Sequence, residues 1–177
     1  MKTLRTDCLV IGSGLAGSAY ALAAAKAGLS VELLSLADPM MANSDWAQGG
    51  IIYDTAPDHA ALARDIFDAS DGTSNPAAVE QLVREGPLAV KELLLDELHV
   101  GFDRDAGGAL KFTREGGHSE KRIIFAKDAT GHAILEAVAQ RVDATPRINR
   151  RAGGVAACRW STPTPASRCC DMLKLSM

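Results

Sequence analysis

The chain has 177 residues, of which 47% are hydrophobic and 23% are charged, and its formal net charge at pH 7 is −3. This composition is typical of a globular domain, and the slightly acidic balance gives no electrostatic reason to expect nucleic acid or an anionic membrane surface as a partner. No apolar stretch approaches the roughly 20 residues that a membrane-spanning helix needs, and no signal-peptide pattern opens the sequence. We therefore expect a cytoplasmic protein with neither nucleic-acid nor membrane partners.

The start of the chain predicts a strand, a helix and a second strand. Residues 7–11 are a short apolar run of the kind found in buried parallel strands. Residues 15–27 are rich in alanine and end at Gly28, a typical stop signal for a helix. Residues 30–34 have the pattern of a second strand. This order indicates a βαβ unit and a fold of the α/β class that is Rossmann-like.

The middle of the chain is predominantly helical. Residues 38–50 are irregular, whereas apolar residues recur at helical spacing in residues 58–69 and 76–98. Residues 101–117 are rich in glycine and turn-forming residues, and residues 128–142 indicate a further helix.

The last part of the chain differs in composition from the rest. Residues 151–177 hold four basic side chains against one acidic side chain, and they show no clear period. We expect residues 1–150 to be the N-terminal part of a cofactor-binding domain. We interpret residues 151–177 as an atypical tail, either disordered or produced by a frameshift, because local consistency is lost there.

A glycine-rich turn lies between the first predicted strand and the helix. Its G-x-G-x-x-G pattern allows a tight turn, lets the backbone approach a pyrophosphate, and lets the helix pack closely on the strand. Phosphates bind at such a helix N-terminus because free N–H groups and the helix dipole favour anions. A purely structural glycine turn is the alternative, although the flanking strand and helix favour dinucleotide binding. The candidate binding residues are Gly12, Ser13, Gly14, Leu15, Ala16 and Gly17.

The acidic residue that usually follows the second strand of a dinucleotide-binding unit is not evident. Glu32 lies within the strand, and Asp38 comes late. Ser35 stands near the expected position and offers a hydroxyl for a ribose hydrogen bond. This pattern argues against a standard NAD dehydrogenase more than against an FAD protein.

Three further segments carry a specific resemblance. They are residues 43–51 (N-S-D-W-A-Q-G-G-I), residues 113–119 (T-R-E-G-G-H-S) and residues 128–131 (D-A-T-G). Together with the glycine turn, they resemble the L-aspartate oxidases of the fumarate reductase/succinate dehydrogenase flavoprotein superfamily. The resemblance extends over about residues 6–142, and the chain looks too short to be a whole enzyme of this kind.

The resemblance implies FAD as the cofactor. In succinate dehydrogenases a histidine carries the flavin covalently, and Asn43 stands at that position here, so the flavin is expected to be non-covalent. Paired glycines allow backbone amides to approach the flavin ring, while Ser44 and Gln48 offer hydrogen bonds to its polar edge. The candidate residues in this segment are Asn43, Ser44, Asp45, Trp46, Ala47, Gln48, Gly49 and Gly50.

Glu115 is the candidate catalytic residue. In the resembled family the matching glutamate lies near the amino group of the bound amino acid, where a carboxylate makes a charge-assisted contact. The alternative is a solvated glutamate that pairs with Arg114 or Arg122. His118 is either a positioning residue near the flavin or a local hydrogen-bonding group. Arg122 could hold a phosphate or a carboxylate, or pair with Glu120 at the surface.

The resemblance also implies a reaction. L-aspartate would be oxidised to iminoaspartate, with oxygen or fumarate as electron acceptor and quinolinate synthase as the next enzyme toward NAD. We expect the chain alone to be inactive, because the family's catalytic arginine and its substrate histidines lie further along than its last residue. The alternatives are a fumarate reductase or succinate dehydrogenase-type flavoprotein, a non-catalytic nucleotide-binding fragment, and an NAD-binding Rossmann domain.

Overall fold

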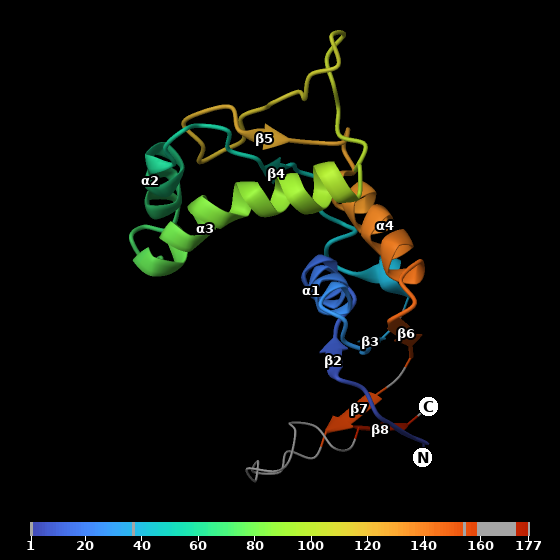
Figure 1. Cartoon of the computed structure of the whole chain (residues 1–177). Helices are drawn as coiled ribbons and strands as arrows, with labels where there is room; N and C mark the ends of the chain where they lie inside the picture. Colours follow the sequence, from blue (N-terminus) through green and yellow to red (C-terminus); the bar gives the residue numbers. More distant parts are fainter. Residues whose placement is uncertain (1, 37, 154, 159–172, 177) are drawn as a thin grey trace. The chain divides into compact units, whose positions relative to one another are not determined.

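The computed structural model describes residues 2–36, 38–153, 155–158 and 173–176, which belong to two compact units (Figure 1). The first unit comprises Met1–Asp45 and Val138–Met177, and the second comprises Trp46–Ala137. None of the helices in the described residues is long and apolar enough to cross a membrane.

A parallel sheet with the strand order β2-β3-β6 forms the centre of the first unit. Every residue of β3 is buried, because β3 is the middle strand and α1 packs against both β2 and β3 (Figure 1). The predicted βαβ unit and the Rossmann-like fold are therefore confirmed. The elements are β2 (Cys8–Ile11), α1 (Leu15–Lys26), β3 (Val31–Ser35) and β6 (Ile148–Ala152), with the one-turn 3₁₀ helix η1 (Pro39–Met41) before the end of the first segment.

Strand β2 is paired on one side only among the described residues. The N–H of Cys8 donates to Ser30 O at 3.0 Å, and the N–H of Gly12 donates to Leu34 O at 2.8 Å. Because successive residues of a strand face opposite edges, the backbone groups of Leu9 and Ile11 face the other edge of β2. The side chain of Ile11 is 71% exposed at the end of this strand.

Strand β6 is held to β3 by polar side chains as well as by the ladder. Glu32, which is buried within β3, accepts hydrogen bonds from Asn149 Nδ2 and Arg151 Nε, each at 2.7 Å. A buried carboxylate is tolerated because it is paired and hydrogen-bonded in this way. Glu32 therefore forms its hydrogen bonds within the sheet, in agreement with its predicted position inside the strand.

The structure extends the ordered fold beyond the boundary expected at residue 150. Strand β6 continues to Ala152, and the N–H of Gly153 donates to Ser35 O at 3.0 Å. The origin of residues 151–177 stays a prediction, and most of this segment, including Thr162–Pro165 and Cys169–Cys170, lies outside the described residues. Three short strands form a separate antiparallel sheet with the order β1-β8-β7; they are β1 (Lys2–Leu4), β7 (Val155–Cys158) and β8 (Leu173–Ser176).

The second unit joins a two-stranded antiparallel sheet to helices. Its core contains Leu62 of α2 and Val79 and Val83 of α3, with apolar side chains of β4 and α2 packed against them. The predicted helices are confirmed, but the two short strands were not predicted. The elements are β4 (Ile51–Ile52), α2 (Ala60–Ala69), α3 (Pro76–Ala89), β5 (Ile123–Ile124) and α4 (Thr130–Asp143), which ends in the first unit.

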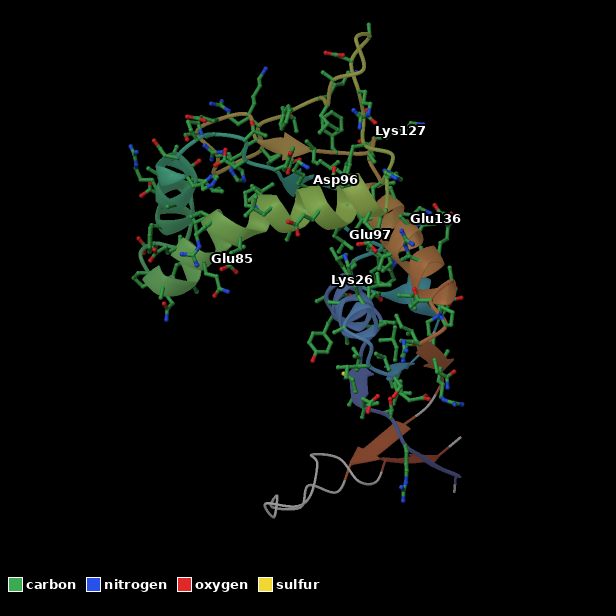
Figure 2. All side chains as sticks on the ribbon, viewed as in Figure 1. Lys26, Glu85, Asp96, Glu97, Lys127 and Glu136 are labelled. Atoms are coloured by element: carbon green, nitrogen blue, oxygen red, sulfur yellow. The ribbon has the colours of Figure 1, made fainter. Side chains whose placement is uncertain are left out.

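Helix α3 changes its winding near its C-terminal end. Asn75 caps its start by accepting hydrogen bonds from the N–H groups of Ala77 and Ala78. Pro87 has no N–H to donate within the helix, and three residues later the chain continues as the π-helix η2 (Val90–Glu97). The wider turn brings side chains five residues apart together, so Lys91 Nζ lies 2.5 Å from Oδ2 of Asp96, which is labelled in Figure 2.

Candidate functional site

The glycine turn between β2 and α1 depends on two of its glycines for different reasons. Gly12 has a φ of +104°, a backbone conformation that residues other than glycine rarely adopt. Gly17 lies so close to the preceding turn that a Cβ atom built on it would be 1.9 Å from the carbonyl oxygen of Gly12. These constraints match the roles that the sequence pattern predicts for its first and third glycines.

The N-terminal end of α1 presents backbone amides with no internal partner. Ser44 Oγ accepts a hydrogen bond from the N–H of Leu15 at 3.3 Å, and the carbonyl of the buried Ser13 accepts one from Ser18 Oγ at 3.0 Å. Within the described residues, the N–H groups of Ala16 and Gly17 donate no hydrogen bond. Two such amides at a helix N-terminus are suited to a phosphate group, so the turn fits the pyrophosphate of a dinucleotide.

Ser35 lies at the end of β3, where the sequence predicted a ribose contact. The side chain is buried, and its hydroxyl donates to Arg151 O at 3.4 Å. The next residue, Leu36, is 85% exposed. The ribose contact of Ser35 stays a prediction.

Residues 46–50, the paired-glycine loop, are held by segments far away in the sequence. The N–H of Gly131, at the start of α4, donates to Ala47 O at 2.9 Å. A Cβ atom on Gly50 would lie 2.2 Å from Ile123 Cγ2 and 2.5 Å from Ile124 O of β5. Only glycine fits at this position, because the backbone of the loop lies directly on β5.

Glu115 is held next to the paired glycines. Its Oε1 atom accepts a hydrogen bond from the N–H of Gly50 at 3.2 Å, and a Cβ atom on Gly49 would lie 3.1 Å from its Oε2 atom. The side chain is exposed, and it forms no ion pair with Arg114 or Arg122, all three being among the described residues. The structure thus brings residues 113–119 and the paired-glycine loop together. The Glu115 carboxylate remains accessible to a ligand.

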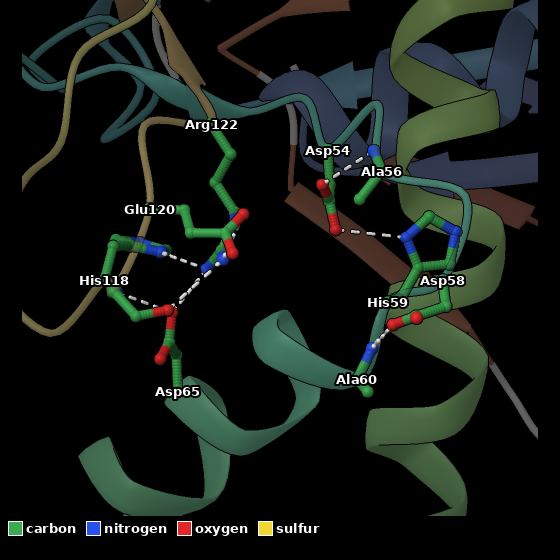
Figure 3. Close-up of polar contacts among 10 residues, drawn as sticks. Asp54, Ala56, Asp58, His59, Ala60, Asp65, His118, Glu120 and Arg122 are labelled. Carbon is green, nitrogen blue, oxygen red and sulfur yellow. Dashed lines mark hydrogen bonds and ion pairs between the residues drawn. The ribbon is translucent and has the colours of Figure 1, made fainter.

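Arg122 is a buried cation rather than a surface charge. Its side chain is only 3% exposed, and its Nη1 atom donates to Asp65 Oδ2 while its Nη2 atom lies 3.5 Å from Oε2 of Glu120 (Figure 3). His118 Nδ1 lies 3.5 Å from the guanidinium, so this histidine contributes to a local network. The pKa of Asp65 is lowered from its ordinary value. Partial burial acts to raise the pKa, but hydrogen bonds from Ser119 and Arg122 outweigh that effect.

Asp65 was not identified as a candidate site residue from the sequence. It lies on α2, three residues after the buried Leu62 and four before Ala69, so helical spacing places it on the inward side. An acidic residue at such a position is a signal that a basic partner exists, but the sequence does not identify Arg122 as that partner.

Other candidate residues remain accessible and without a demonstrated role. Trp46 is 69% exposed, and Asn43 and Gln48 are exposed as well, so their flavin contacts stay predictions. Within the described ranges, no group of three metal-ligating side chains is placed to hold a metal ion.

The fold and the glycine turn define a class of protein. The chain belongs to the FAD binding domain family, whose model matches residues 7–153. The cofactor is therefore FAD, as the sequence predicted. Among curated proteins, the chain is similar to the L-aspartate oxidase of Halobacterium salinarum, with 44% identity over 145 residues, which is 81% of this chain and 28% of that protein.

Other relatives agree with this assignment. The chain is 37% identical over 145 residues to the chloroplastic L-aspartate oxidase of Oryza sativa, covering 81% of this chain and 22% of that protein. It therefore spans about a quarter of the length of the curated relatives that it matches.

Solved structures show the same architecture. The E. coli quinol fumarate reductase flavoprotein superimposes with a TM-score of 0.79 and 27% identity, over 88% of this chain and 27% of that one. The Sdh1 complex of Mycobacterium smegmatis gives a TM-score of 0.78 at 23% identity, over 85% of this chain and 28% of that one. The second match bears on the fold alone.

Proposed function

We propose that this chain is the FAD-binding part of an L-aspartate oxidase, which oxidises L-aspartate to iminoaspartate and passes the electrons to oxygen or fumarate. The observation that carries the proposal is the position of Glu115, whose accessible carboxylate is held at 3.2 Å from the Gly50 N–H. The names of the curated relatives support the same substrate.

The residues of this chain have three tasks in the proposed reaction. The free amides of Ala16 and Gly17 bind the pyrophosphate of FAD. The paired-glycine loop lets the backbone at Gly49 approach the flavin, while the N–H of Gly50 donates to Glu115. FAD, when bound, would supply the oxidant for the α-carbon of the substrate. Glu115 receives the ammonium group of L-aspartate in a charge-assisted contact, which succinate cannot make.

Two carboxylate groups of the substrate also need partners, and arginine is the residue best suited to bind them. Among the described residues, the buried Arg122 is already paired with Asp65 and is not available for this purpose. We therefore propose that residues 1–177 bind FAD but do not turn over L-aspartate by themselves, and that the carboxylate-binding groups come from the part of the enzyme that the relatives have beyond the matched region.

The experiment uses the 177-residue chain and a chimera that joins residues 1–153 to the remainder of the Halobacterium salinarum enzyme. Anaerobic bleaching of the flavin is followed after addition of L-aspartate or succinate. We expect both proteins to bind FAD and only the chimera to be reduced by L-aspartate. Failure of both proteins to bind FAD would overturn the proposal.

Two variants of the chimera isolate the role of Glu115. Replacing Glu115 by Gln removes the charge that faces the ammonium, so the rate of reduction by L-aspartate should fall by about tenfold or more. Glu136→Gln, at an exposed position of α4, is the matched control and should leave the rate unchanged. An unchanged rate in Glu115→Gln would contradict the assignment of Glu115.

A fumarate reductase-type activity is the second candidate, because a fumarate reductase superimposes with a TM-score of 0.79. It predicts that succinate, rather than L-aspartate, bleaches the flavin of the chimera. A non-catalytic nucleotide-binding role predicts bound FAD that neither compound reduces.

The finer assignments belong to the same proposal. The product iminoaspartate is unstable in water, so we propose quinolinate synthase as the enzyme that consumes it, with both enzymes in the cytoplasm. A pull-down of quinolinate synthase by the chimera, but not by an unrelated flavoprotein, would test this partnership.

A further inference from the structure

The loop that carries Glu115 is closed at its base by a pair of backbone hydrogen bonds. The N–H of Thr113 donates to Ile123 O at 2.9 Å, and the N–H of Ile123 donates to Thr113 O at 3.2 Å. Between these residues the chain passes through Gly116 and Gly117, and Gly117 has a φ of +81°. Two adjacent glycines leave the backbone conformationally free. The Thr113–Ile123 hydrogen bonds therefore do not by themselves fix the orientation of the Glu115 side chain.

Asp65 of α2 provides a second attachment for this loop. Its Oδ2 atom accepts hydrogen bonds from the N–H of Ser119 at 2.8 Å and from Ser119 Oγ at 3.0 Å. The same atom accepts a hydrogen bond from Arg122 Nη1, and Figure 3 shows this pair. Both contacts of Asp65 lie on the side of the loop that follows the two glycines. The N–H of His118 donates to Glu115 O at 3.2 Å across the glycines and joins this side to Glu115.

The position of Asp65 is itself fixed by the core of the second unit. Leu62, one turn earlier on α2, is 2% exposed and packs against Val79 and Val83 of α3. Among the described residues, the other acid that pairs with Arg122 is Glu120, which is 60% exposed and has its Oε2 atom 3.5 Å from the guanidinium, so it is not equally placed to replace Asp65. The side chain of Arg122 is 3% exposed and needs a buried counter-ion.

We infer that Asp65 is a positioning residue for Glu115: by tying Ser119 and Arg122 to α2, it holds the loop so that the Glu115 carboxylate stays on the Gly50 N–H. Under the proposed function, on which this role rests, Asp65 is therefore a remote determinant of selectivity for a dicarboxylate that bears an ammonium group. Asp65 contributes no contact to the substrate in this role.

The test compares the Gly50 amide resonance of the ¹⁵N-labelled 177-residue chain with that of its variants by NMR at pH 7. Because its N–H donates to the Glu115 carboxylate, the Gly50 amide should resonate downfield of its position in Glu115→Gln, and this difference is the Gly50 amplitude. In Asp65→Asn, we expect the Gly50 amplitude to fall by about half or more, because the loop no longer holds Glu115 in place.

Two further variants separate positioning from stability. Asp68→Asn changes an exposed acid of the same helix and should keep the full amplitude. Ser119→Ala removes one hydrogen bond to Asp65 but keeps the Arg122–Asp65 ion pair, so it should fold and show an intermediate amplitude. If Asp65→Asn does not fold, the Ser119→Ala amplitude decides the question.

A full Gly50 amplitude in folded Asp65→Asn, or in Ser119→Ala when Asp65→Asn does not fold, would overturn the role of Asp65. The result is independent of the substrate, because no ligand is added. Failure of the proposed function would appear only in the flavin-bleaching experiment, so the two failures are distinguishable.

Discussion

The glycine turn of the first unit and the paired-glycine loop of the second unit both present backbone amides, but they are built differently. The glycine turn is formed by one short stretch of sequence, and the tight contact of Gly17 is with Gly12. The paired-glycine loop takes its shape from Ile123, Ile124 and Gly131, which lie much further along the chain. A local turn is encoded by its own residues, whereas an assembled loop depends on tertiary packing that its own sequence does not contain.

The largest effect is expected from Gly17→Ala in the glycine turn. A Cβ atom 1.9 Å from a backbone oxygen forces the helix away from the turn, and we expect a loss of about 3 kcal/mol in the free energy of unfolding. Gly14→Ala is the matched control, since its Cβ atom would lie 3.4 Å from Ser44 Oγ, an ordinary contact. It should keep most of the stability and weaken FAD binding, because the second glycine is where the backbone approaches the pyrophosphate.

Urea denaturation and FAD fluorescence titration distinguish these two outcomes. If Gly14→Ala were as destabilising as Gly17→Ala, the separate roles assigned to the two glycines would be wrong.

The second effect concerns Gly50 in the paired-glycine loop. Gly50→Ala places a Cβ atom against β5, and we expect a loss of about 2 kcal/mol measured by urea denaturation. Gly116→Ala serves for comparison, because a Cβ atom there meets nothing within 4 Å. A Gly50→Ala variant as stable as Gly116→Ala would show that the loop does not depend on its packing against β5.

The third effect is a pH dependence of stability that originates at Asp65. Its folded-state pKa lies below the ordinary value of 3.8. The resulting stability is therefore complete above the unfolded-state pKa and is lost as the pH falls through the folded-state pKa. We expect the urea midpoint of the wild-type chain and of Asp68→Asn to fall together in this acid range, and the midpoint of Asp65→Asn to fall less. Equal falls in all three proteins would assign the acid sensitivity to other carboxylates.

The smallest effect is expected from Ser44→Ala. The hydroxyl of Ser44 accepts from the N–H of Leu15 at 3.3 Å, in place of the side-chain cap that Gly14 cannot provide. Its loss should cost about 0.5–1 kcal/mol of stability in urea denaturation. Ser74→Ala, in the loop between α2 and α3, provides a control of the same chemistry outside the first unit. A larger loss from Ser74→Ala would contradict this capping role.

These contrasts explain how much the sequence could predict. The βαβ unit and the glycine turn follow from periodicity and from residues close to one another, so they were predicted with nearly correct bounds. Strands β4 and β5 have two residues each, too few to give a period. The β6 strand contains Asn149, Arg150 and Arg151, and its polar pattern makes sense only beside the buried Glu32.

In the candidate site, too, local motifs were predictable from the sequence and contacts between distant residues were not. Glu115 was identified from a motif, but its contact with Gly50 joins residues that are far apart in the sequence. Arg122 could not be assigned because its partner, Asp65, lies on a helix 57 residues earlier. Charged residues on separate elements give no pairing signal in a single sequence, so their partners become visible only in the folded chain.

Strand β2 is paired on one side only in the part of the chain that the structure describes, and this has a practical consequence for handling the polypeptide. The backbone groups of Leu9 and Ile11 form a short open template beside an exposed isoleucine, and such templates recruit strands from neighbouring molecules. We expect light scattering of a purified sample to rise with protein concentration, and a charged substitution at Ile11 to suppress that rise. Solubility during purification would then depend on the exposed edge of β2 rather than on the negative net charge of the protein.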